Sequence, residues 1–146
     1  MQHHNHIPKP NHYIVMFFIM LLAGVLSTMN VWADKPADVR LSLNDLYMIL
    51  LMTGWMFLFM GAFYREWNVF FVGLGLVLTQ VWCIRTQFMV STDQYLQGMI
   101  PHHSMAVHMS RQLLRKPNHI PDFLQHIIRS QEGEIELMRR RQQAKA

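Results

Sequence analysis

The sequence predicts an all-α protein in which three transmembrane helices are followed by a C-terminal antiparallel helical hairpin. Composition is the first reason: of 146 residues, 51% are apolar and only 15% are charged, whereas soluble domains carry about 25% charged residues. The second reason is that three uncharged stretches approach the length of about 20 residues that a membrane helix needs. The third is that the last third of the chain has helix start and stop signals and lacks strand patterns.

The three uncharged stretches cover residues 13–33, 46–64 and 67–84, and predict a membrane anchor over 13–85. A His-rich leader of 12 residues precedes them. Aromatic residues near the ends are typical of membrane interfaces. The first stretch ends in Val31-Trp32-Ala33, which resembles a signal-peptidase site. Because the leader holds a single Lys and the apolar region is long for a signal, we expect an uncleaved helix.

A helical hairpin is predicted over residues 91–142. Ser91 is a suitable N-cap, and Lys116-Pro117-Asn118 should end the first helix at about Arg115. Pro121 suits the first turn of a second helix, which runs to about Arg141. Two helices of this length bury little core by themselves. We therefore expect the hairpin to pack on other helices, form oligomers or bind a metal ion.

Three His and three Met residues lie within 11 positions of the first hairpin helix: Met99, His102, His103, Met105, His108 and Met109. At about 100° per residue, Met99, His102, His103 and Met109 share a face, whereas His108 points away. If the two helices pair antiparallel about residue 118, Glu134 lies level with His102 and Met138 lies beside Met99. Imidazole and thioether groups form a soft ligand set that suits Cu(I), and Glu134 could bind the ion or accept an imidazole N–H. The alternative is that the methionines fill a small core and that the His pair caps a kink at Pro101.

Residues 93–106 resemble the signature of the bacterial family called domain of unknown function 305, whose hallmark is Met-Ile-Pro-His-His, here residues 99–103. The second hairpin helix repeats the family's later pattern with Gln131, Glu134-Ile135 and Met138. The resemblance implies a ferritin-like helical fold and a copper ion bound by Met99, His102, His103 and Met138. Met105, Met109 and Glu134 are weaker candidates.

The flanking sequence resembles a membrane-anchored branch of the same family. Charge counts alone leave the orientation open. The resemblance implies a bacterial inner membrane, with the N-terminus in the cytoplasm and the hairpin in the periplasm.

The N-terminus is a second candidate metal site. His3, His4 and His6 follow the terminal amine closely. An amine, two amide nitrogens and the imidazole at position three can form a square-planar Cu(II) or Ni(II) site. The alternative is a polar leader without a metal.

The absent motifs argue against an enzyme. The predicted spans contain no His or charged residue, which a proton pump or charge-coupled transporter would need. The chain has no Glu-x-x-His pair for a di-iron site, no glycine-rich phosphate loop and no recognisable catalytic triad. It also lacks a nucleic-acid-binding motif.

We therefore expect membrane-anchored binding of copper or a similar soft metal, for tolerance or hand-over. The alternative is a non-catalytic structural subunit whose hairpin mediates homo-oligomer formation or docking to a larger membrane complex. The expected partners are the lipid bilayer and either further copies of the chain or that complex.

Overall fold

The computed structural model describes residues 10–144, and within that range it contains helices but no strand. His3, His4 and His6 lie outside the described residues, so the second candidate metal site is not placed. The elements in chain order are α1 (Pro10–Leu26), η1 (Met29–Trp32), η2 (Pro36–Asp38), α2 (Leu43–Tyr64), α3 (Trp67–Thr86), α4 (Thr92–Leu114) and α5 (Pro121–Gln143). The predicted all-α fold is confirmed.

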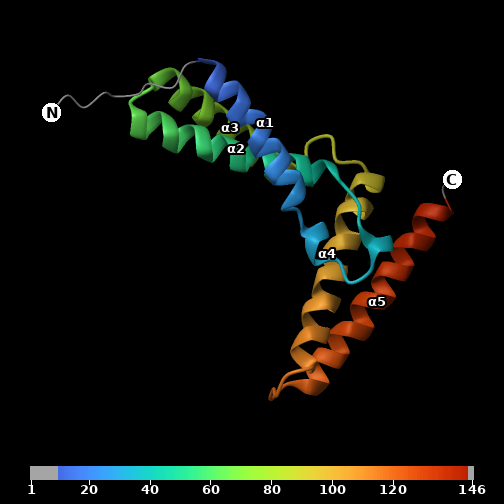
Figure 1. Ribbon diagram of the computed structural model, residues 1–146. Helices are drawn as coiled ribbons and strands as arrows, with labels where there is room; N and C mark the ends of the chain where they lie inside the picture. The colour runs from blue at the N-terminus through green and yellow to red at the C-terminus, as the bar shows by residue number, and fades with distance from the viewer. Residues whose placement is uncertain (1–9, 145–146) are drawn as a thin grey trace. The chain divides into compact units, whose positions relative to one another are not determined.

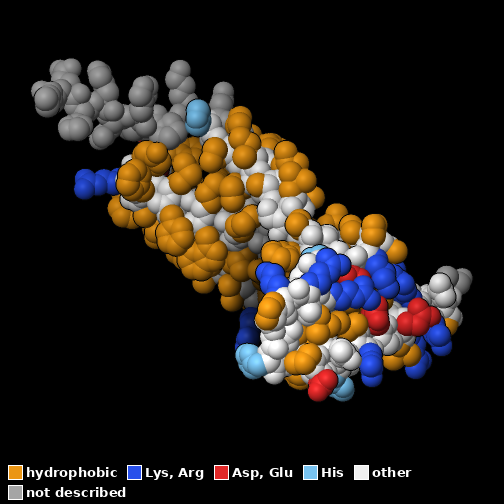
Figure 2. All heavy atoms as spheres, turned by 60° about the horizontal axis from the view of Figure 1, so that its bottom comes forward, with side chains coloured by type: hydrophobic (Ala, Val, Ile, Leu, Met, Phe, Trp, Pro, Cys, Tyr) orange, Lys and Arg blue, Asp and Glu red, His pale blue; other side chains and the backbone are white. Residues whose placement is uncertain are grey.

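Helix α1, helix α3 and α2 from Leu46 onward belong to one compact unit, whose described residues are 10–26 and 46–88. Among the described residues, three segments are long and apolar enough to cross a membrane: His12–Trp32, Leu43–Tyr64 and Trp67–Thr86. Large apolar side chains remain exposed along all three helices, and Figure 2 shows them covering the visible face of this unit. Such a surface is expected where lipid, rather than water, surrounds the helices.

The close packing of α2 against α3 depends on small residues. At Gly73 of α3, an added Cβ would collide with the backbone of Leu58 in α2. Gly61 of α2 meets the backbone of Phe70 in the same way. The short turn between the two helices places Arg65 at φ 58°, in the left-handed region. Helices α2 and α3 therefore form a tight antiparallel pair, because glycine lets the two backbones approach.

Helix α1 ends at Leu26, before the end of the first uncharged stretch, and residues 27–45 belong to the second compact unit. The side chain of Asn30 forms two hydrogen bonds with the backbone of Arg40, which we call the Asn30–Arg40 clamp. Its amide donates to the Arg40 carbonyl over 2.7 Å, and the Arg40 amide donates to Asn30 Oδ1 over 2.8 Å. We call residues 27–42 the α1–α2 loop. The clamp closes this loop on itself, so the chain leaves the helical path soon after Leu26.

The second unit consists of the α4–α5 hairpin and residues 27–45 (Figure 1). The predicted signals operate where expected: Ser91 Oγ accepts from the Gln94 amide at the start of α4, and α5 begins at Pro121. The apolar core of the hairpin comprises Ile100 and Val107 from α4 and Leu124 and Ile135 from α5. Pro101 lies inside α4 and is buried, without ending the helix.

The α1–α2 loop packs on α4 and is bonded to both hairpin helices. Ser104 Oγ accepts from the Asp34 amide over 2.9 Å and donates to Asp38 Oδ2 over 2.8 Å. Asp38 also pairs with Arg139 of α5. At Gly98 of α4, an added Cβ would lie 3.0 Å from Ser42 Oγ at the end of the loop. The hairpin is thus covered by a third segment from much earlier in the chain.

Candidate metal-binding site

His103 is held between the two hairpin helices. Its side chain is 12% exposed, and its Nδ1 lies 3.0 Å from Glu134 Oε2 of α5, a close ion-pair distance without the directed geometry of a hydrogen bond. Burial lowers the pKa of His103; the charge of Glu134 opposes this shift, and neighbouring His102 adds to it. The sequence placed Glu134 beside the His pair, and the structure brings it to His103.

His102 is the exposed member of the pair. Its ring centroid lies 6.0 Å from that of His103, with the two planes at 71°. Successive helical residues diverge by about 100°, so the two imidazoles leave the helix in different directions. His102 Nδ1 lies 3.4 Å from Met29 Sδ, which belongs to the α1–α2 loop. The structure therefore adds a thioether to the cluster from outside the hairpin.

Met29 was not among the ligands predicted from the sequence. It precedes His102 by 73 positions. It lies near the end of an apolar stretch, where a methionine is expected to face lipid like its neighbours. No local spacing relates it to the hairpin. The one feature of the sequence that could have indicated Met29 is its place at the end of the first apolar stretch, close to the predicted membrane surface.

The remaining predicted ligands lie on the same two helices as the His pair and Glu134. Met99 and Met105 are half-buried on α4, and Met138 is half-buried on α5. Met109 is 53% exposed. Within residues 10–144, no three His, Cys, Asp or Glu side chains group closely enough to hold an ion. A metal site here would therefore need thioether sulfur beside its imidazoles.

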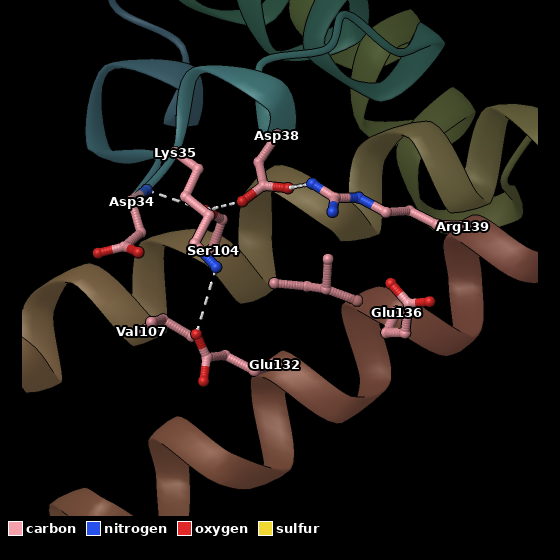
Figure 3. Close-up of a pocket in the computed structure, with 9 residues that line it drawn as sticks. Asp34, Lys35, Asp38, Ser104, Val107, Glu132, Glu136 and Arg139 are labelled. Atoms are coloured by element: carbon pink, nitrogen blue, oxygen red, sulfur yellow. Dashed lines mark hydrogen bonds and ion pairs between the residues drawn. The ribbon is translucent and has the colours of Figure 1, made fainter.

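A polar cavity of about 100 Å³ separates the loop from the hairpin (Figure 3). Asp38, 2% exposed, lies between Ser104 and Arg139 in this view. Glu132 of α5 pairs with Lys35 of the loop over 3.4 Å and with Arg111 of α4 over 2.7 Å. Asp38 and Glu132 each pair with a cation, so the ion pairs around the cavity connect the loop to the hairpin with their charges compensated.

Two comparisons with known proteins match this chain. The model of the family described as Domain of unknown function (DUF305) matches residues 85–142. The chain is also 39% identical over 132 residues to "Uncharacterized protein L153" of Acanthamoeba polyphaga mimivirus, covering 86% of this chain and 87% of the viral protein. The family match begins at residue 85, whereas the alignment with the viral protein covers 86% of the chain. The viral similarity therefore includes much of the apolar region before residue 85. No solved structure matches the chain significantly.

Proposed function

The chain belongs to the DUF305 family, and we propose that it binds Cu(I) or a similar soft metal ion through the Met/His cluster of its hairpin. His102 and His103 would supply imidazole nitrogen, and Met99 and Met138 thioether sulfur. Neutral nitrogen and sulfur donors are the ligands that Cu(I) and Ag(I) prefer. Met105 and Met109 are secondary candidates on the same helix.

The contact between His103 and Glu134 is the observation that carries the proposal. A ligand imidazole is commonly oriented by a carboxylate at its second nitrogen. Glu134 Oε2 lies 3.0 Å from Nδ1 of His103, at ion-pair distance but without hydrogen-bond geometry, and a small rotation of either side chain would make Nδ1 the donor and leave Nε2 for an ion. The residues on the chain thus fit a soft metal in chemistry, and Glu134 would orient one ligand rather than bind the ion itself.

We propose that helices α1–α3 anchor this site in a membrane, on the basis of their length and apolar surface. In a bacterium this would be the inner membrane, with the N-terminus in the cytoplasm and the hairpin in the periplasm. The role would be metal tolerance or hand-over of the ion to a partner.

The experiment is a Cu(I) titration of the full-length protein in detergent micelles against a chromophoric Cu(I) chelator. His102→Ala/His103→Ala should lose binding by well over 100-fold, and Glu134→Gln should weaken it by about 10-fold, the smaller effect of an orienting residue. The matched control is His119→Ala/His126→Ala, since both residues are exposed and lie outside the cluster. Unchanged stoichiometry and affinity in the His102/His103 variant would refute the proposal.

A second candidate function is assembly through the hairpin. Phe123 and Leu137 of α5 are both more than half exposed, and their separation of 14 residues brings them near one helix face. Such a face suits packing against another copy or a larger membrane complex. Phe123→Ser/Leu137→Ser would then reduce the oligomer size measured by light scattering in micelles and leave Cu(I) affinity unchanged.

A further inference from the structure

We infer that Met29 is a ligand of the same metal ion as His102, so that the α1–α2 loop supplies part of the metal site. The inference rests on the proposed soft-metal function and deepens it, because it extends the site beyond the hairpin. It also names the ion class: a soft monovalent cation such as Cu(I) or Ag(I).

The distance between the two donor atoms fits one shared ion. With the bond lengths typical of zinc sites, about 2.0 Å to imidazole nitrogen and about 2.3 Å to thiolate sulfur, a tetrahedral angle places two donors of one ion about 3.5 Å apart. His102 Nδ1 and Met29 Sδ lie 3.4 Å apart. The two side chains therefore already hold the spacing that a common ion requires.

The same pair is open to an incoming ion. Met29 is 36% exposed and His102 is exposed, whereas His103 behind them is nearly buried. An ion from solvent would meet the thioether and the outer imidazole first. No movement of the helices is needed to reach these two donors.

The backbone on each side of the pair is held in place. On the loop, the Asn30–Arg40 clamp closes the segment that begins at Met29. On the helix, Ser104 stands two residues after His102 and bonds to Asp34 and Asp38 of the loop. Because these bonds tie the loop to α4 close to the donors, the spacing is preorganised, and preorganised ligands lose little entropy on binding.

The thioether of Met29 would act on selectivity more than on total affinity. Imidazole nitrogen accepts Zn(II) and Cu(II) as well as Cu(I), whereas each thioether sulfur favours Cu(I), so Met29 would add to the preference that Met99 and Met138 give. Loss of Met29 should therefore weaken Cu(I) and leave Zn(II) nearly unchanged. An N–H···S hydrogen bond from His102 would produce the same distance without this selectivity, so the two explanations differ in a measurable way.

The test compares Met29→Leu with the wild type in the full-length protein in micelles, with Cu(I) and Zn(II) as separate probes. Leucine keeps the apolar bulk and removes the sulfur. We expect Cu(I) affinity to fall at least 10-fold, with Zn(II) affinity within about twofold, and X-ray absorption to show one sulfur fewer around Cu(I). Met89→Leu is the matched control, because Met89 is 76% exposed and lies outside the cluster.

If Met29→Leu matches Met89→Leu in Cu(I) affinity and sulfur count while His102→Ala/His103→Ala abolishes binding, the inference fails and the proposed function stands. If the wild type binds no Cu(I), both fail together.

Discussion

The interactions that stabilise each compact unit internally differ between the two units. In α1–α3, glycines let backbones touch and apolar side chains face outward, as at Gly73 against Leu58. In the hairpin unit, a buried carboxylate, Asp38, joins the loop to both helices through Ser104 and Arg139. Packing in the first unit depends on the close fit of small residues, and packing of the loop on the hairpin in the second depends on paired charges. Substitutions that change only size or only charge should therefore separate the two.

The largest effect is expected from Asp38→Asn in the hairpin unit. It leaves Arg139 without its partner at a site where Asp38 is almost fully buried, and breaking one side of such a pair costs about 3 kcal/mol. Amide hydrogen exchange in α4 and α5 of the full chain should accelerate accordingly, with α2 and α3 unaffected. Lys35→Ala removes an exposed pair with Glu132 and should cost under about 1 kcal/mol. Equal protection of α4 in both variants would contradict the assigned role of charge.

A smaller effect is expected from Gly73→Ala in α3. The new methyl group would collide with the backbone of Leu58, which cannot move aside as a flexible side chain could. Overpacking of this kind costs about 1–3 kcal/mol, so the melting temperature in micelles should fall. Gly75→Ala is the matched control, since open space surrounds that position. The idea that shape holds α2 and α3 together is wrong if the two variants melt alike.

A local effect of about 1 kcal/mol is expected from Ser91→Ala, because it removes the side-chain cap of α4. Hydrogen exchange should rise in the first turn of α4 and remain unchanged in α5. Ser91→Asp keeps an acceptor at the cap and should retain protection. Loss of protection throughout the hairpin would show that the cap has a wider role than the local one assigned here.

The smallest effect concerns pH and His103. Burial lowers its folded pKa below the usual 6.5, against the charge of Glu134 and with the help of His102. The unfolded chain therefore takes up a proton first as pH falls, and hairpin stability declines from about pH 6.5 down to the folded pKa. Above that window the contribution is complete. Thermal melts at a series of pH values should show a decline that His103→Gln removes; an identical decline in the variant would exclude His103 as its source.

Several parts of the fold were predictable because their signals are local. Ser91, the break at residues 116–118 and Pro121 each act within a few residues of their own position, and each has the predicted effect. The apolar stretches likewise predicted three long helices. Helix α1 ended early because Asn30 bonds to Arg40, and that partner cannot be read from the stretch itself.

The candidate site was predictable only along the hairpin. Helix periodicity placed His102 and His103 side by side, and the pairing of two antiparallel helices brought Glu134 within one residue of its actual contact, His103. Both steps use regular geometry, in which positions follow from residue number. The copper ligands themselves, Met99, His102, His103 and Met138, stay a prediction.

From local chemistry the chain by itself determines where its helices begin, which surfaces are apolar and which helix carries the His/Met cluster. Only the tertiary structure decided that the α1–α2 loop covers the hairpin, with Met29 beside His102 and Asp38 between Ser104 and Arg139. These partners are 66 to 101 residues apart. An irregular loop has no period to project across such distances, so its place depends on which buried charges and donors find partners when the chain packs.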